Sequence, residues 1–261
     1  MARRTLCDSR AIVTGASSGI GWAIALELAR RGVRSIVTAR RADRLDELVS
    51  QIAALGGEVH AVAGDITDAQ LRQRVLDTAA ERFGGLDILI NNAGVGAIGP
   101  FARANEQRLR RIMEVNFFAP AEMMRTALPM LREGRRPIVV NVSSVLGHRA
   151  VPKNSEYCAS KFALHGLSDA VRAELAREGV DLLVVSPSTT ASEFFDNVLE
   201  RKGQLAWCKL GRASSASVAR ATVRAIRAGR HEIILSPGGK LLVWLDRLCP
   251  PLVNRLVARF G

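Results

Sequence analysis

Long hydrophobic runs are missing from the sequence. The longest apolar stretches, such as Leu241–Leu245, are far shorter than the roughly 18 residues that a membrane-spanning helix needs. The apolar residues that follow Arg3 and Arg4 are interrupted at Asp8, which is too early for the core of a signal peptide. We therefore expect neither a transmembrane helix nor a signal peptide, and a cytoplasmic location.

Cysteine is scarce, and repeats are absent. The four cysteines, at positions 7, 158, 208 and 249, include no CxxC pair and no spacing typical of zinc ligands. We expect free thiols in a reducing compartment and no metal site. Because there is also no internal repeat, low-complexity tract or proline-rich linker, residues 1–261 are expected to form a single domain.

Acidic residues are fewer than basic ones. Asp and Glu number 25 against 37 Lys and Arg, which gives a formal net charge of +12. This charge favours acidic partners such as phosphates, anionic lipid headgroups or nucleic acid. We expect no nucleic-acid binding, because the sequence has no recognised motif and no stripe of interleaved basic and aromatic residues. Apolar residues make up 48% of the chain and charged residues 24%, which excludes a disordered or fibrous protein.

Short β-like runs alternate with longer helical patterns along most of the chain. A strand over Ala11–Thr14, a helix over 19–31 and a strand over Ser35–Ala39 form a first βαβ unit. The alternation continues with helices over 42–55, 68–83, 105–131 and 155–178 and strands over 58–64, 86–91, 138–142, 181–185 and 232–235. Several strands are almost continuously apolar, as parallel strands covered on both faces are. We predict an α/β fold: a single-domain doubly wound parallel sheet, a Rossmann-type three-layer sandwich, with a C-terminal amphipathic extension.

A glycine-rich turn joins the first strand to the first helix. Because glycine has no Cβ, the backbone there can approach a pyrophosphate closely, and the free N–H groups at a helix start attract that anion. An ordinary glycine-rich turn is the alternative, but the strand before and the helix after it favour dinucleotide binding. The predicted contacts are Gly15, Ser17, Ser18, Gly19, Ile20 and Gly21.

The spacing of these glycines, GxxxGxG, resembles that of the short-chain dehydrogenase/reductase family. Further matches follow in the family's order from about residue 11 to residue 187, and more weakly to the end. They are Asp65 after the third strand, Asn91-Asn92-Ala93-Gly94 after the fourth, Asn116 in the long helix, Ser144 after the fifth, and Tyr157-Cys158-Ala159-Ser160-Lys161 in the next helix.

The resemblance implies catalytic roles for Ser144, Tyr157, Lys161 and Asn116. In the family, the matching Tyr is the general acid for ketone reduction and the base for alcohol oxidation, the Ser hydrogen-bonds the substrate oxygen, and the Lys also holds the nicotinamide ribose. Lowering a tyrosine pKa of about 10 by about 3 units takes roughly 4 kcal/mol. A lysine charge at about 4 Å supplies roughly that amount at an effective dielectric of about 20. The family's helix Asn, matched by Asn116, supports a water-linked proton relay, and an asparagine that caps its own helix backbone is equally compatible with the sequence.

The resemblance also implies further contacts to a dinucleotide. Asp65 and Ile66 match the family's adenine-contacting position, although a helix cap is the alternative for Asp65, which Thr67 or Asp68 could provide instead. The segment that shapes the cofactor floor in the family is matched by Asn92, Ala93 and Gly94.

The loop after the sixth strand departs from the family's pattern. The family carries Pro-Gly there and then a Thr near the nicotinamide, whereas this chain has Pro187-Ser188 and Ser192. A Cβ at Ser188 restricts the backbone, so we expect Pro187 and Ser192 to contact the cofactor in an altered loop pose.

The end of the second strand carries the prediction of cofactor type. An NAD enzyme of this kind places an acid where Arg40 stands, and this chain has none there. A guanidinium suits bidentate contact with a 2′-phosphate, so Arg40, aided by Arg41, predicts NADP(H) in preference to NAD(H). Solvated loop arginines are the alternative.

Two C-terminal segments bear on the substrate and the partners. The variable substrate lid of the family falls at about 188–212, where aromatic and aliphatic residues indicate a lipophilic substrate or merely cover the core. His148 lines the same pocket or lies in a surface loop. The tail over about 239–261 combines helically spaced apolar residues with Lys and Arg. We favour packing of this tail on its own subunit or on a dimer mate. The alternative is that the tail lies on an anionic membrane.

We therefore predict an NADP-dependent oxidoreductase that acts on the carbonyl or alcohol of a lipophilic molecule. The alternative within enzymes is a 3-oxoacyl reductase, whose acidic carrier or CoA suits the basic surface. A catalytically idle NADP-binding regulator is the alternative from another class, and Ser144, Tyr157 and Lys161 together disfavour it. The resemblance also implies a homodimer or homotetramer built on the long helices.

Overall fold

A parallel β-sheet forms the centre of the protein in the computed structural model, which describes residues 4–191, 193–195, 198–201 and 213–259. Within these residues seven strands pair in the order β3-β2-β1-β4-β5-β6-β9, and every pairing is parallel. Their bounds are β1 Arg10–Thr14, β2 Arg34–Ala39, β3 Val59–Ala63, β4 Ile88–Asn91, β5 Ile138–Val142, β6 Asp181–Ser186 and β9 Glu232–Ile234. The strand order reverses between β1 and β4, and ligands bind at such a switch point.

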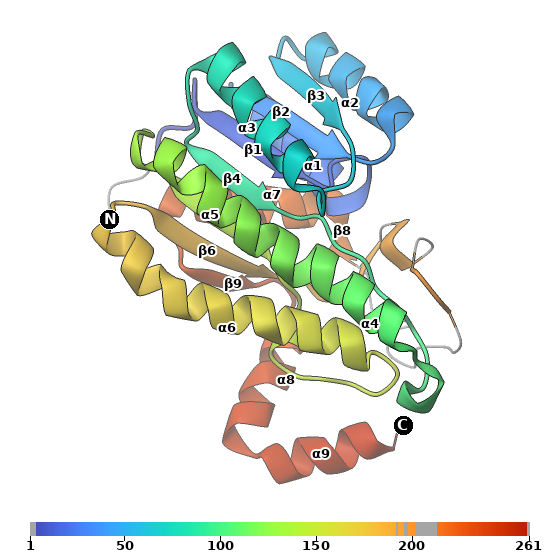
Figure 1. The fold of residues 1–261 in the computed structure, drawn as a ribbon. Helices are drawn as coiled ribbons and strands as arrows, with labels where there is room; N and C mark the ends of the chain where they lie inside the picture. Colours follow the sequence, from blue (N-terminus) through green and yellow to red (C-terminus); the bar gives the residue numbers. More distant parts are fainter. Residues whose placement is uncertain (1–3, 192, 196–197, 202–212, 260–261) are drawn as a thin grey trace.

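Helices cover both faces of the sheet (Figure 1). One face carries α1 Gly19–Ala29, α2 Ala42–Ala54 and α7 Ser215–Ala228, and the other carries α3 Ala69–Phe83, α5 Ala119–Arg132 and α6 Ser155–Arg177. Side chains alternate between two cores, because successive strand residues point to opposite faces: Val13 and Val37 join the first, and Ile12 and Ile36 the second. The predicted three-layer α/β sandwich is confirmed.

Helix α3 shows how the sequence sets the bounds of an element. Asp68 caps its start by accepting a hydrogen bond from the backbone N–H of Gln70 at 2.8 Å. Gly84 ends it in the left-handed conformation, with a φ of 71°. The sequence left Thr67 and Asp68 as candidates for the cap of this helix, and Asp68 is the residue that caps it.

The helix predicted over 105–131 is interrupted in the structure. It consists of α4 Glu106–Met113, a π-helical segment Glu114–Phe118 and α5. A π-helical turn is one residue wider than an α-helical one, so periodicity alone does not reveal it, and such turns are frequent at functional sites. This segment contains the buried Asn116.

Several elements were not predicted. Helix α7 was missed, and its buried face combines Val218, Val223 and Ile226 with alanines, which weakens the apolar pattern. A two-stranded parallel sheet pairs β7 Thr190–Ala191 with β8 Ala213–Ser214. Single 3-10 turns lie at Phe101–Arg103, Val145–Gly147 and Glu193–Phe195.

The tail forms two further helices, α8 Pro237–Leu248 and α9 Pro250–Ala258, which extend from the rest of the molecule (Figure 1). Ser236 caps α8 by accepting a hydrogen bond from the N–H of Gly239 at 2.9 Å. Pro250 and Pro251 begin α9, because proline is tolerated in a first helical turn. No helix in the described ranges is long and apolar enough to cross a membrane.

Candidate active site

A cavity of about 830 Å³ lies at the carboxyl end of the sheet. Its lining begins at the glycine-rich turn after β1, passes the ends of β2, β4, β5 and β6, and ends at α8 and α9. Most of the residues predicted from the sequence lie along this lining: Gly15, Ser17, Ser18, Gly19, Ile20, Arg40, Arg41, Asp65, Ile66, Asn92, Ala93, Gly94, Ser144, Tyr157, Lys161 and Pro187. The fold therefore brings together positions that are far apart in the sequence.

The glycine-rich turn packs tightly against the segment that follows β4. Gly15 has a φ of +66°, and a Cβ there would lie 2.7 Å from the Cα of Ala93. A Cβ on Gly21 would lie 2.4 Å from the carbonyl oxygen of Gly15. The Asn92 side chain donates hydrogen bonds to the carbonyls of Thr14 and Gly15, at 3.0 and 3.1 Å, which fixes the turn. Glycine is required at both positions, because any side chain would force the turn open.

The start of α1 can accept an anion. Ser18 is its N-cap residue, and the Ser18 side chain caps none of the first backbone N–H groups. Gly19 begins the helix with a φ of +59°. The first turn contains no acidic residue, so the positive end of the helix dipole is not neutralised from within the helix. This geometry fits the pyrophosphate of a dinucleotide.

Ser144, Tyr157 and Lys161 converge beside β5. Ser144 follows the strand in extended conformation, and its Oγ accepts a hydrogen bond from the N–H of Leu146 at 3.1 Å. A side-chain hydrogen bond also joins Ser144 to Tyr157. The Nζ atom of Lys161 donates to the carbonyl of Val142 at 2.9 Å and lies 5.8 Å from the centre of the Tyr157 ring. A hydroxyl pair with a buried ammonium beside it can orient and protonate a carbonyl oxygen.

The pKa values of this group depart from the expectation that Lys161 lowers the pKa of Tyr157. Burial raises the pKa of Tyr157, and the hydrogen bond with Ser144 opposes that shift. Burial also lowers the pKa of Lys161 to about 8. The ammonium lies against the Val142 carbonyl, and desolvation therefore dominates both groups. Tyr157 is poised as a proton donor in this arrangement.

The side chain of Asn116 fixes the backbone of Val95, a residue of the cavity wall. Its Nδ2 donates to the carbonyl of Val95 and to Ser160 Oγ, each at 2.9 Å, and its Oδ1 accepts from the N–H of Val95 at 2.8 Å. The side chain does not cap its own helix, so that alternative is wrong. It fixes the segment beside Gly94, where a Cβ would lie 3.7 Å from Lys161 Nζ.

Asp65 is already engaged by neighbouring groups. Its carboxylate accepts from the N–H and the hydroxyl of Thr67, at 3.0 and 2.8 Å, and pairs with Arg111. These hydrogen bonds lower the pKa of Asp65 against the opposing effect of burial. Arg111 also lines the cavity, and sequence reasoning missed it because a helix surface arginine is usually solvated.

The two arginines after β2 differ in their surroundings. Arg40 is exposed, and among the described residues it forms no hydrogen bond or ion pair. Arg41 donates to Ser17 Oγ at 3.2 Å and pairs with Glu193 at 3.0 Å. Glu193 comes from the predicted lid, and its contact with Arg41 lowers the pKa of its carboxyl. Arg40 is therefore the guanidinium available to a ligand.

The predicted lid is described only in part. Pro187 accepts a hydrogen bond through its carbonyl from the N–H of Val145 at 3.0 Å. The Phe194 ring lies 5.4 Å from the Tyr157 ring, measured between centroids, and lines the cavity. Ser192, Leu205 and Trp207 lie outside the described residues.

The tail closes the far end of the cavity with apolar side chains. These are Leu242, Leu245, Val253, Leu256 and Val257. The side of the tail that lines the cavity packs on its own subunit, which is one of the arrangements that we expected. The tail's contribution to the pocket could not be derived from its helical spacing, because the spacing does not tell where an amphipathic helix docks.

His148 occupies neither of the places that the sequence allowed. Its side chain is 3% exposed, which excludes a surface loop, and it is not among the cavity-lining residues. Its Nε2 lies 2.9 Å from Ser186 Oγ.

Comparison with known proteins agrees with this arrangement. The family described as short chain dehydrogenase matches residues 9–203. The ketoacyl reductase HetN of Nostoc sp. is 32% identical over 98% of this chain and 91% of its own length. A short-chain dehydrogenase/reductase from Burkholderia phymatum in complex with NAD superposes with a TM-score of 0.87 at 26% identity, over 95% of this chain and 96% of that one.

A second solved structure carries the other cofactor. A short-chain dehydrogenase from Burkholderia cenocepacia in complex with NADP has a TM-score of 0.81 at 28% identity, over 91% of this chain and 100% of that one. The fold, the glycine-rich turn and the family match agree. The chain belongs to the short-chain dehydrogenase/reductase family.

Proposed function

We propose that this protein is an NADP(H)-dependent oxidoreductase that interconverts a carbonyl and a secondary alcohol on a lipophilic substrate. The observation that carries the proposal is the convergence of Ser144, Tyr157 and Lys161 in a cavity whose other end is apolar. We further propose that residues 1–261 form one catalytic domain.

The chain's own residues provide binding and proton transfer. A bound nicotinamide would supply or accept the hydride. Ser144 would orient the substrate oxygen, and Tyr157, whose raised pKa keeps it protonated, would donate the proton during reduction. Lys161 is mostly protonated at neutral pH with a pKa of about 8, so its charge favours negative charge that develops on the substrate oxygen. In the family, the Asn that matches Asn116 supports a proton relay. In this protein Asn116 also positions the wall of the site.

The site fits a phosphorylated dinucleotide. The glycine-rich turn and the uncapped start of α1 suit the pyrophosphate, and Asp65, Ile66, Asn92, Ala93 and Gly94 would line the path of the dinucleotide. The exposed Arg40, with no acid at the end of β2, supports NADP(H) over NAD(H). Pro187 and Ser192 remain proposed contacts near the nicotinamide.

The apolar walls support a lipophilic substrate. Phe194, Val145 and Leu146 lie near the catalytic end of the cavity lining, and side chains of α8 and α9 line the rest. Burying an apolar group against such walls is worth roughly 25 cal/mol per Å². A small, fully hydrated ketone would forgo most of that binding free energy.

A 3-oxoacyl reductase is the second candidate. The relationship to a protein named ketoacyl reductase and the net charge of +12 favour it, because acyl carriers and CoA are acidic. A catalytically idle regulator is disfavoured, because it has no need to keep the Ser144, Tyr157 and Lys161 arrangement.

A turnover assay separates these candidates. The purified protein would be given NADPH, then NADH, with lipophilic ketones and aldehydes, matched 3-oxoacyl thioesters and short hydrophilic ketones. We expect turnover of the lipophilic carbonyls that prefers NADPH. Faster turnover of 3-oxoacyl thioesters would support the second candidate, and NADPH binding without any turnover would support the regulator.

The outer side of the tail supports a peripheral membrane contact, which we also propose. Leu241, Trp244 and Leu248 are exposed on α8, and Lys240 and Arg247 accompany them. The apolar side chains would enter the interface while the cations meet anionic headgroups. Sedimentation with vesicles tests this: we expect binding to anionic vesicles that Leu241→Glu with Trp244→Glu abolishes, whereas equal sedimentation of both proteins would contradict it.

A further inference from the structure

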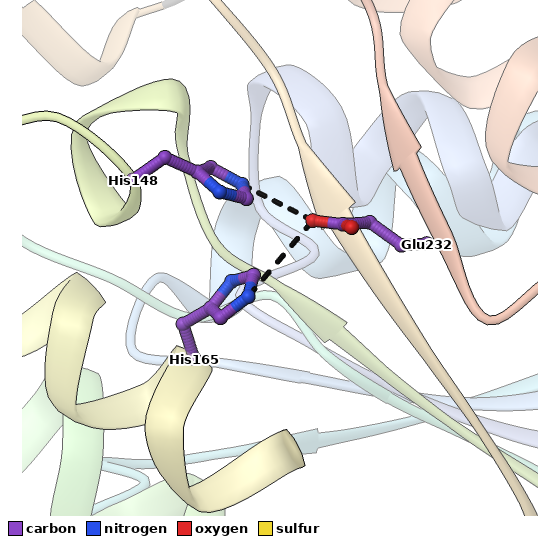
Figure 2. A group of neighbouring side chains, drawn as sticks. All are labelled: His148, His165 and Glu232. Carbon is purple, nitrogen blue, oxygen red and sulfur yellow. Dashed lines mark ion pairs between the residues drawn. The ribbon is translucent and has the colours of Figure 1, made fainter. Parts of the chain in front are cut away.

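Two histidines and a glutamate meet outside the cavity. His148 follows β5 and its 3-10 turn, His165 lies on α6 one turn beyond Lys161, and Glu232 begins β9 (Figure 2). One potential ligand atom from each lies within 4.8 Å of the others. Because none of the three lines the cavity, the proposed hydride-transfer chemistry does not account for them.

The distances are close to those of a metal centre. His148 Nε2 is 3.2 Å and His165 Nε2 is 3.9 Å from the same oxygen, Glu232 Oε1. Ligands about 2.1 Å from a tetrahedral zinc ion lie roughly 3.4 Å apart. The distances from Glu232 Oε1 to the two imidazole nitrogens therefore differ from that separation by about 0.2 and 0.5 Å.

The two imidazoles pack against each other, and one of their ring nitrogens has no hydrogen-bond partner in the described part of the chain. The Nδ1 atom of His165 is buried and has no hydrogen-bond partner among the described residues. The two imidazole rings meet edge to face, with centroids 4.4 Å apart. His165 faces Glu232 through Nε2, so Nε2 is the atom that would bind an ion and the unpartnered Nδ1 is not a ligand atom.

Charged side chains lie around the three proposed ligands. A neutral imidazole has the lone pair that a metal needs. Asp169 lies 3.3 Å from His165 Nε2 and is itself held by Arg172 at 2.6 Å. The carboxylates of Glu232 and Asp169 favour a cation here, and Arg247 opposes it.

We propose that His148, His165 and Glu232 bind a zinc ion. Two imidazoles and one carboxylate form a donor set that zinc accepts, with a fourth position left for a water molecule or for Ser186, whose Oγ is 2.9 Å from His148 Nε2. The ion would tie the segment after β5, helix α6 and strand β9 together. These elements carry Ser144 and Tyr157 and lead into α8, so the site stabilises the frame of the cavity rather than the reaction.

The test is metal binding to the full-length protein. Chelator-treated protein would be titrated with Zn²⁺ in competition with a chromophoric chelator, and with Co²⁺ while its visible spectrum is recorded. We expect one tightly bound ion, a four-coordinate Co²⁺ spectrum and a higher thermal unfolding midpoint with Zn²⁺. The variants His165→Gln and Glu232→Gln should weaken binding by more than the roughly 10–100-fold that an outer partner's loss costs.

The matched control is the pair His60 and Glu58, which lie 3.9 Å apart without a second histidine. His60→Gln and Glu58→Gln should leave zinc binding unchanged. Circular dichroism and NADPH binding would show that each variant is folded. Wild-type protein that binds no zinc, or variants of the cluster that bind it as tightly as wild type, would overturn the proposal, and a clear preference for Fe²⁺ over Zn²⁺ would overturn the assignment to zinc.

Discussion

Tyr157 is the only tyrosine in the chain, so its ionisation can be observed without interference from other phenols. Burial raises its pKa, and the Ser144 hydrogen bond opposes that shift only in part. We predict that the ultraviolet difference spectrum of the cofactor-free protein shows almost no phenolate at about pH 10, where a free tyrosine is half ionised. Tyr157→Phe supplies the blank, and half-ionisation at or below pH 10 would contradict the account.

The pKa of Lys161 is shifted in the opposite direction from that of Tyr157, and this shift affects both stability and activity. Its folded pKa of about 8 is below its unfolded value, so the unfolded chain binds more protons and this group makes stability rise as the pH increases above about 8. The same deprotonation removes the charge beside Tyr157. We predict that kcat/KM for reduction falls above about pH 8, and a profile that stays flat to pH 10 would contradict it.

Arg40 decides the proposed cofactor preference. Replacing it in Arg40→Asp removes a guanidinium and places an acid at the end of β2, where the acid suits a ribose diol and repels a 2′-phosphate. We predict that NADPH binds about 10–100-fold more weakly, at roughly 1.5–3 kcal/mol for a lost charged hydrogen bond, and that NADH binds no worse. Arg30→Asp, on the far end of α1, is the control. Equal losses for both cofactors would show that Arg40 does not read the phosphate.

Individual site residues were predictable where a motif fixes both type and position. Ser144, Tyr157 and Lys161 stand in their predicted places because a strand end and one helical turn define them. The partners of Asp65 and Arg41 were not predictable, since Arg111 and Glu193 reach them from segments distant in sequence. The raised pKa of Tyr157 in the cofactor-free protein was not predictable, because a sequence does not show the desolvation of Tyr157 and Lys161.

At the scale of elements, a buried ion pair joins α4 to the start of α6. Arg108 donates from Nε to Glu156 at 2.9 Å and also pairs with Glu200, which lies within the predicted lid. Arg108 and Glu156 side chains are each 4% exposed. Glu156 immediately precedes Tyr157, so this pair fixes the end of the helix that carries the proton donor.

Breaking the buried Arg108–Glu156 pair should lower the free energy of unfolding by more than breaking a surface pair on α4 does. We predict that Arg108→Ala lowers the free energy of unfolding by about 3–5 kcal/mol, because it leaves a buried carboxylate without its partner. Arg110→Ala, which removes the exposed pair with Glu106, should cost less than about 1 kcal/mol. Urea unfolding of the two variants measures the difference, and equal losses would contradict the assignment of a structural role to Arg108.

Element boundaries followed from the sequence where caps and periodic patterns agree. Asp68 and Gly84 bound α3 as expected of a capping acid and a left-handed glycine. The π-helical segment at 114–118 was invisible, because its register depends on Asn116 binding Val95 across the site. Helix α7 was missed because alanine and threonine form much of its buried face.

At the scale of the whole molecule, apolar side chains remain exposed on the layer that contains α4 and α6. They are Leu109, Phe118 and Phe162. We propose that this face joins two copies of the chain, in a homodimer or as part of a homotetramer, as the family resemblance implies. The pairing of large apolar side chains between copies would remove them from water.

Substitutions on this face should change the oligomeric state. We predict that Phe118→Glu combined with Phe162→Glu yields a monomer in sedimentation-velocity ultracentrifugation, while wild type sediments as a dimer or tetramer. Leu55→Glu, an equally exposed apolar position at the end of α2, should leave assembly unchanged. A monomeric wild type, or an unchanged state in the double variant, would contradict the proposal.

The sheet order and the layers followed from alternating strands and helices, because parallel strands need crossover helices on both faces. The placement of the tail could not be predicted from the sequence, because an amphipathic pattern shows which face of a helix is apolar but not what that face contacts. The histidine cluster was equally hidden, because its members come from three elements separated along the chain.

The most direct test of the central claim compares Tyr157→Phe with wild type in both binding and turnover. The substitution removes one hydroxyl and keeps the ring that packs near Phe194. We predict unchanged NADPH affinity and a loss of about 10²–10⁴-fold in kcat for reduction of a lipophilic carbonyl. Turnover that remains close to wild type would show that Tyr157 is not the proton donor and would contradict the proposed function.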